Sequence, residues 1–407
     1  MGVVSCGTTM LDQGVFENIG AVTWDTTVKT SGFTAVSGNG YFCNTTSAAF
    51  TVTLPSSPSA GDIVGIKDYA NTADTNNITI GRNGSNIQGV AADFKISTTG
   101  GSVLLVYVDG TQGWKVTSAS NAADLSSTQY IVATGGTITC SGDYKIHTFT
   151  GPGTFCVSNA GAPGGSDNVD YVVVAGGGAG GSGQGGAGGG GAGGYRASFP
   201  SPAGTTPVSV QGYPITIGAG GTGNTPPSPT GGSGSNSVFS TITSAGGGGG
   251  AKQPNGTGAS GGSGGGGSID GGCGGAGNTP PVSPSQGNSG GNSPGDGTSI
   301  KGGGGGGASA VGQNGTPSPA VGGAGSANSI TGSSVTRAGG GGGSVSSGSG
   351  AAGGAGGGGA GGGGGCVGTV GTTNTGGGAG GGSPTPGSTP SANGGSGIVI
   401  ITYKYRN

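Results

Sequence analysis

The sequence predicts an all-β protein in which a glycine-rich domain follows smaller β domains. Three observations support this fold class. Glycine accounts for 112 of the 407 residues, about four times its usual share. No segment has a convincing helical period of apolar residues. Two strongly apolar strands, at 169–175 and 397–405, bracket the glycine-rich part. Composition divides the chain into an N-terminal β domain at 1–120, a short β segment or connector at 121–168, and a glycine-rich domain at 169–407.

Residues 1–120 predict a compact β domain. Ile78 and Ile80 alternate with polar residues, which is typical of a half-buried strand. The run 102–108 is continuously apolar and predicts a strand buried on both faces. Asp109-Gly110 then predicts a turn into a returning strand at 113–117. Further strands are expected at 50–54 and 62–67, and Asn83-Gly84 predicts another tight turn.

The connector contains four strand candidates separated by glycine-rich and proline-containing turns. They are 131–134, 137–140, 144–150 and 154–157.

The glycine-rich domain alternates between glycine runs and spacers rich in Pro, Ser, Thr and Asn. Between Gly176 and Gly397 there are six charged residues: Arg196, Lys252, Asp270, Asp296, Lys301 and Arg337. Fixing each backbone costs about 1–2 kcal/mol, and glycine runs bury no side chains to offset this cost. The region is therefore either a flexible linker or an ordered sandwich of extended polyglycine-II helices, each with three residues per turn. The two bracketing strands favour the sandwich, because their pairing would close the region into one unit.

This order of blocks resembles the glycine-rich domain of bacteriophage tail-fibre proteins and adhesins. The residues that carry the resemblance are 142–155, Val169 to Gly178, Gly191 to Arg196, Tyr213 to Gly221, Asn236 to Phe239 and Gly394 to Tyr403. The segment Asn77 to Ile87, together with Gly113-Trp114, is similar to a module of marine phage fibres of the cyanophage type.

The resemblance implies a virion structural protein that recognises the host cell surface through loops held on the glycine-rich scaffold. It also implies an elongated homotrimer, contacts with other phage tail proteins, and a bacterial receptor that is a glycan or an outer-membrane protein. The alternative is a passive structural or decoration protein of the virion that binds no receptor. Met1 to Gly14 lacks the features of a secretory signal, so we expect synthesis in the host cytoplasm and location in the virion.

Composition argues against several other functions. The net charge is −2, and no basic face predicts nucleic-acid binding. His147 is the single histidine and lies in an expected strand, where a sheet-surface position is favoured over a general base. The six cysteines are scattered and predict free thiols. We therefore expect no enzymatic activity, no metal and no cofactor.

Receptor contacts are expected in four loops, because recognition commonly lies in loops on a rigid scaffold. These loops are 224–230, 278–287, 313–320 and 382–393, with Tyr195 and Tyr213 as aromatic alternatives whose other role is to anchor the loops. The candidate contact residues are Asn224, Thr225, Asn278, Thr279, Gln313, Asn314, Thr385, Asn393, Tyr195 and Tyr213.

Overall fold

The computed structural model describes most of the chain as two compact units. It describes residues 4–5, 8–9, 22–120, 130–161, 166–183, 185–200, 206–223, 230–293, 295, 301–315, 320–383 and 391–406. The first unit is built from residues before 130, and the second from 130–161 and from 166 onward. The described residues form strands and no α-helix, which confirms the predicted all-β class. A search of these residues finds no helix long and apolar enough to cross a membrane.

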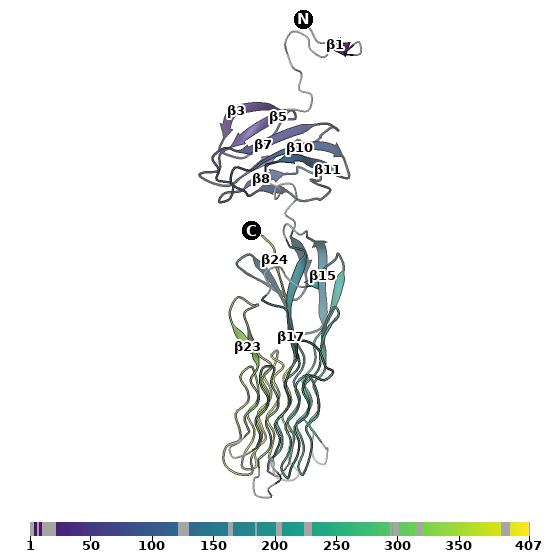
Figure 1. Ribbon diagram of the computed structural model, residues 1–407, viewed down its shortest axis with the longest axis vertical. Coiled ribbons are helices and arrows are strands. Elements are labelled where there is room, and N and C mark those ends of the chain that lie inside the picture. Colours follow the sequence, from purple (N-terminus) through teal and green to yellow (C-terminus); the bar gives the residue numbers. More distant parts are fainter. Residues whose placement is uncertain are drawn as a thin grey trace. The chain divides into compact units, whose positions relative to one another are not determined.

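In the first unit the chain alternates between two sheets from β3 to β8 (Figure 1). One sheet has the strand order β11-β10-β7-β5-β3 and the other β4-β6-β8-β9, and buried apolar residues of both sheets form the core. Strands β3, β5 and β7 run parallel, as do β4, β6 and β8. The strands of this unit are β1 (Val4–Ser5), β2 (Thr8–Thr9), β3 (Thr23–Lys29), β4 (Phe33–Thr34), β5 (Asn39–Cys43), β6 (Phe50–Thr53), β7 (Ile63–Asp68), β8 (Ile78–Gly81), β9 (Phe94–Ile96), β10 (Ser102–Asp109) and β11 (Gly113–Ala119).

All five strands predicted in this unit are present, but the burial predicted for one of them is wrong. Val103 and Leu105 of β10 are buried, whereas Val108 is 45% exposed. The prediction that this run is buried on both faces is therefore wrong, because only one face of its sheet packs on the core. The two predicted turns are confirmed. Strands β10 and β11 form a hairpin, and Asn83 and Gly84 both have positive φ angles.

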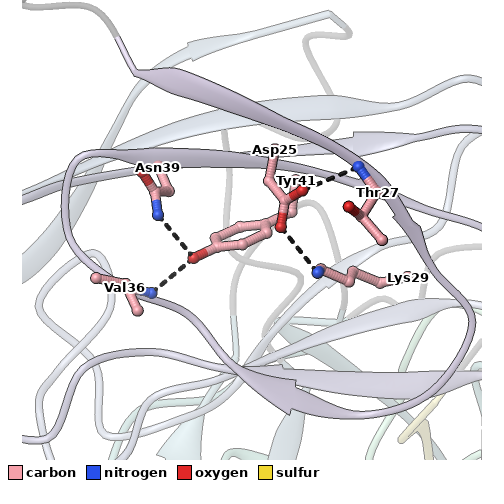
Figure 2. Close-up of polar contacts among 6 residues, drawn as sticks. All are labelled: Asp25, Thr27, Lys29, Val36, Asn39 and Tyr41. Atoms are coloured by element: carbon pink, nitrogen blue, oxygen red, sulfur yellow. Dashed lines mark hydrogen bonds and ion pairs between the residues drawn. The ribbon is translucent and has the colours of Figure 1, made fainter.

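Two groups of polar contacts lie within β3 and between β5 and the segment that precedes it (Figure 2). The Lys29 ammonium lies 2.8 Å from Oδ2 of Asp25, and Oδ1 of Asp25 accepts the Thr27 amide at 2.9 Å. The hydroxyl of Tyr41 accepts the Val36 amide at 2.9 Å. The hydrogen bonds from Lys29 and Thr27 lower the pKa of Asp25 to about 2, so this carboxylate is ionised across the physiological range.

The second unit contains two packed sheets, of which one holds both bracketing strands. Its strand orders are β12-β15-β19-β20-β21 and β13-β14-β24-β16-β17, with β18 paired to β16 and a separate β22–β23 hairpin. The strands are β12 (Ile131–Thr134), β13 (Thr137–Ser141), β14 (Tyr144–Phe149), β15 (Gly153–Ala160), β16 (Asn168–Val174), β17 (Tyr195–Ala197), β18 (Thr206–Pro207), β19 (Gly212–Thr216), β20 (Ser237–Phe239), β21 (Ile242–Ser244), β22 (Ser326–Asn328), β23 (Val335–Arg337) and β24 (Ile398–Lys404).

The bracketing strands β16 and β24 pair antiparallel, with Val173 opposite Val399. This pairing confirms that the ends of the glycine-rich domain close on each other. One face of the two strands lies in the core between the sheets, and the other face contributes to a second apolar cluster with Ile146 and Ile330. The pair is therefore buried on both sides, which explains its continuous apolar sequence.

The expected connector is part of the second unit. Strand β14 pairs with β24, and β15 pairs with β19, so its strands complete both sheets of the glycine-rich domain. A boundary based on composition misses this, because the partner strands lie far along the chain. His147 also differs from expectation. It lies in β14 as predicted, but its side chain is fully buried, because the face of β14 that carries it turns toward the second sheet.

The glycine-rich segments form a hydrogen-bonded array below the two sheets in Figure 1. Within the segment 175–183, amides three residues apart donate to the same neighbouring segment, and consecutive amides donate to different ones. Gly177 and Gly180 donate to 391–397, Gly178 and Gly181 to 186–194, and Gly176 and Ala179 to 230–236. A period of three is that of an extended helix with three residues per turn.

The carbonyl groups of the same segment face three further neighbours. They accept amides from the segments 217–223, 245–251 and 377–383. The segment 175–183 is therefore surrounded by six others, which satisfies backbone groups that cannot pair within an extended helix. This network favours the ordered sandwich over the flexible linker.

Close contact between backbones explains why the segments are made of glycine. A Cβ atom at Gly178 would lie 2.1 Å from the carbonyl oxygen of Gly248, and one at Gly190 would lie 2.2 Å from that of Gly178. Even a methyl group at such a position would force the neighbouring backbone away. The glycine runs are thus a packing requirement of the array.

Candidate functional site

One end of the glycine array collects the turns between successive segments. We call this the loop end and define it by the described residues at the bases of the turns. They are Gly223, Thr230, Asn292, Lys301, Asn314, Val345, Ser383 and Asn393. The segments alternate in direction along the chain, so every second junction between segments lies at this end of the array, which is the end away from the strands in Figure 1. The opposite end of the array joins the strands.

Side chains connect the bases of these turns. The Oδ1 atom of Asn393 accepts the Gly223 amide at 2.7 Å, and Oδ1 of Asn314 accepts the Asn292 amide at 2.8 Å. The Ser293 hydroxyl donates to the Lys301 carbonyl at 2.7 Å. Each contact joins two different segments, so the ends of these segments are held together.

A buried serine completes the connection across the loop end. Ser344 is fully buried, and its hydroxyl oxygen accepts the Ala187 amide at 2.7 Å. The same hydroxyl lies 2.7 Å from the Gly185 carbonyl and 3.3 Å from the Gly382 carbonyl. Three segments therefore meet at one side chain. The spacing of the serines does not predict this role, because serine is frequent throughout the glycine-rich domain.

A model of a glycine-rich domain family matches residues 149–404. The chain belongs to this family. The match begins at the last residue of β14 and ends at the last residue of β24. The glycine-rich domain so defined contains the whole array, both bracketing strands and the loop end. No curated protein matches the sequence.

Within the glycine-rich domain, the described ends of three of the four expected loops lie at the loop end. Thr230 is the last residue of the loop 224–230, Gln313 and Asn314 begin the loop 313–320, and Asn393 ends the loop 382–393. The fourth loop, 278–287, lies at the opposite end, because its Gln286 carbonyl accepts the Tyr195 amide at the start of β17. The sequence prediction did not separate these two groups.

The candidate residues at the loop end differ in which of their atoms form hydrogen bonds within the protein. Asn314 and Asn393 are exposed, but each commits Oδ1 to a backbone amide. Gln313 is exposed, and its backbone is fixed by hydrogen bonds to Val321 and Gly304. Gln313 therefore presents its side chain from a rigid backbone. Asn224, Thr225 and Thr385 lie outside the described residues.

The loop 278–287 is held by its own side chains. Asn278 has a φ angle of 50°, and its Oδ1 accepts the Val282 amide at 3.1 Å while its Nδ2 donates to the Val282 carbonyl. Thr279 is exposed, and its hydroxyl donates to the Gly277 carbonyl at 3.2 Å. The side chain of Asn278 thus stabilises the turn, and Thr279 lies at its surface.

The two aromatic candidates are anchors within the fold. Tyr213 of β19 is 9% exposed and belongs to the core between the sheets, and its hydroxyl accepts the Ser209 amide at 2.8 Å. Tyr195 of β17 is half-buried and packs on the second apolar cluster. Neither residue lies at the loop end.

The described part of the chain contains few side chains that could act in acid–base catalysis or bind a metal. Nδ1 of His147 donates to the Gly135 carbonyl at 2.8 Å, and Nε2 lies 3.1 Å from Tyr403 Oη. Burial lowers the pKa of His147. The search of described residues finds no group of three or more His, Cys, Asp or Glu that could hold a metal. The five cysteines it covers are free, as predicted.

Proposed function

We propose that this chain is a virion structural protein, a phage tail fibre or receptor-binding adhesin that recognises the bacterial surface through its loop end. The observation that carries the proposal is that the described ends of three expected loops meet at one end of the array, where hydrogen bonds hold their backbone. Rigid placement of loops limits the entropy lost when a receptor binds. A scaffold made of backbone hydrogen bonds also leaves the turns free to vary in sequence, since no side-chain core depends on them.

Receptor binding through the loop end requires exposed polar side chains on an ordered base. Gln313 meets both conditions, and the amide nitrogens of Asn314 and Asn393 donate to no described residue. Amide side chains that both donate and accept are suited to hydroxyl-rich receptors. A surface glycan therefore fits the loop end better than an apolar protein surface does.

We propose further that the protein acts as a homotrimer and contacts other virion proteins. The first unit supports association, because the sheet β11-β10-β7-β5-β3 has partly exposed apolar side chains, including Trp24 at 42% and Val108 at 45%. Such surfaces are commonly covered by association. Sedimentation equilibrium of the purified protein should give three times the chain mass of 37.0 kDa. A mass equal to one chain at micromolar concentration would contradict the trimer.

Adsorption competition tests receptor binding. Purified protein is mixed with the bacterial host before virus particles are added, and the remaining free particles are counted. We expect a dose-dependent loss of adsorption. If folded protein neither binds the cells nor slows adsorption, the protein is a passive structural or decoration component of the virion. A reducing-sugar assay on host polysaccharide should stay negative, and release of sugar ends would contradict a non-enzymatic role.

A further inference from the structure

A cavity of about 470 Å³ lies between the β22–β23 hairpin and the outer face of the sheet that contains β14 and β24. Alternation along β14 places Tyr144 and Ile146 on the same face, and Thr402 of β24 is paired with Ile146. The volume is within the range that is typical of small-molecule sites. The described residues that line the cavity are Ser141, Tyr144, Ile146, Phe199, Pro200, Ser329, Ile330, Gly332 and Thr402.

Contacts within the protein hold the walls of this cavity in place. Nδ2 of Asn328 donates to the Phe199 carbonyl at 2.9 Å, and its Oδ1 accepts the Ile330 amide at 2.8 Å. The Asn328 side chain therefore ties the hairpin to the segment that carries Phe199. In the turn of the hairpin, Gly332 lies against the Ser141 side chain, since a Cβ there would be 2.5 Å from Oγ of Ser141. The cavity is thus formed before any ligand binds, which lowers the entropy lost on binding.

The lining combines aromatic rings with free hydroxyl groups and carries no charge. Tyr144 is 37% exposed and Phe199 is half-buried. The hydroxyl groups of Ser141, Tyr144 and Ser329 form no hydrogen bond with the described residues. None of the described lining residues is charged, so an ion would lose its hydration there without gaining a counter-charge. The lining therefore favours a neutral ligand.

We propose that this cavity binds a neutral hexopyranoside. One face of a pyranose ring presents C–H groups, and the electron-rich face of an aromatic ring attracts them; Tyr144 and Phe199 supply such rings. Sugar hydroxyls both donate and accept hydrogen bonds, as do those of Ser141 and Ser329. A wholly apolar ligand would take water from these hydroxyls and leave them unpaired. The cavity lies beside the strands, away from the loop end, so the proposal does not rest on the proposed function.

Ligand-observed nuclear magnetic resonance on the full-length protein tests this site with the methyl α- and β-glycosides of D-glucose, D-galactose and D-mannose. We expect at least one of them to bind with a Kd of about 1 mM or tighter. Ser329→Phe adds a ring at the cavity from an exposed position and should weaken the tightest binder about tenfold or more. Ser333→Phe is the matched control and should not change binding, because Ser333 is exposed in the same turn but does not line the cavity.

Two further variants separate stacking from hydrogen bonding. Tyr144→Phe keeps the ring and should weaken binding less than Tyr144→Ala, which removes it, once melting curves establish that each variant folds. The proposal is overturned if no glycoside of the panel binds the folded wild-type protein at up to about 20 mM, or if Ser329→Phe binds as tightly as Ser333→Phe. It is also overturned if cyclohexanol binds more tightly than every glycoside, because the cavity would then be a site for apolar compounds.

Discussion

Nε2 of His147 lies 3.1 Å from the hydroxyl oxygen of Tyr403, and the two rings are stacked with centroids 5.6 Å apart. The contact joins β14, which precedes the glycine array, to β24, which follows it. Phe155 meets the imidazole edge-on from the opposite sheet. The single histidine of the chain therefore lies in the core that closes the glycine-rich domain.

The buried imidazole predicts that the second unit loses stability as the pH falls. Burial lowers the pKa of His147, whereas the unfolded chain titrates near 6.5. Below about pH 6.5 the unfolded state therefore binds more protons, and the free energy of unfolding decreases until the pH reaches the folded-state pKa. Above about pH 6.5 this residue contributes no pH dependence.

Denaturation between pH 8 and pH 5.5 can measure this effect. Both tryptophans, Trp24 and Trp114, lie in the first unit, so their fluorescence reports that unit, and near-ultraviolet circular dichroism of tyrosine reports mainly the second. His147→Gln should be less stable at pH 8 but should lack the wild-type decline between pH 6.5 and 5.5. An identical decline in the variant would assign the pH dependence to other groups.

Many strands of the second unit could be predicted from local sequence. The features that could not be predicted depend on contacts between residues far apart in the chain. The strongly apolar runs at β16 and β24 predicted both strands, whereas their burial on both faces is a finding of the structure. The burial of His147 could not be predicted, because the segment 144–149 does not alternate regularly and both faces of the strand carry polar and apolar residues. Its partner Tyr403 lies far along the chain, and only tertiary structure brings them together.

The end of the array at which each loop lies could have been predicted from the sequence. Each glycine-rich segment crosses the array once, so counting reversals from β16 assigns every loop to one end. The loop 278–287 then falls beside the strands, apart from the other three.

Strands β3 and β5 were not predicted, for a different reason. Gly40 interrupts the apolar pattern of β5, and it is needed because a Cβ there would lie 2.7 Å from the Trp24 ring.

Substitution of Gly178 tests the packing of the array. Gly178→Ala places a Cβ atom 2.1 Å from the Gly248 carbonyl oxygen and should lower the free energy of unfolding by about 1–3 kcal/mol, the usual cost of overpacking. Gly151→Ala is the matched control in the same unit, since a Cβ there meets nothing within 4 Å. Chemical denaturation should separate the two variants. Equal, negligible effects would mean that the segments are not packed against one another.

Asn393 is expected to fix the base of one loop. Asn393→Leu removes the acceptor of the Gly223 amide. It should lower the free energy of local opening at Gly223 by about 1 kcal/mol. Hydrogen exchange at Gly223 should accelerate, while exchange at Gly178, whose amide bonds to Gly191, should not change. Asn393→Asp retains the acceptor oxygen and should preserve protection. Unchanged exchange at Gly223 in the leucine variant would show that the side chain does not cap this segment.

Asp25 in the first unit should titrate well below an ordinary aspartate. The Lys29 contact and the Thr27 amide lower its pKa to about 2, so its stabilising interactions are present above about pH 4 and are lost as the pH falls through 2. Nuclear magnetic resonance titration of the carboxyl carbon measures this value directly. Lys29→Met should raise the pKa toward 3.8, and an unaltered value would contradict the assigned cause.

Replacement of loops, first at the loop end and then at the opposite end of the array, tests most directly whether the loop end recognises the host. Residues 224–229 and 384–390 are replaced together by Gly/Ser sequences of equal length, and a second variant carries the same replacement at 279–285, beside the strands. Both are compared with the intact protein in adsorption competition after melting curves establish that they fold. We predict that the first variant loses competition and the second retains it. Loss in the second variant alone, or in neither, would contradict recognition through the loop end.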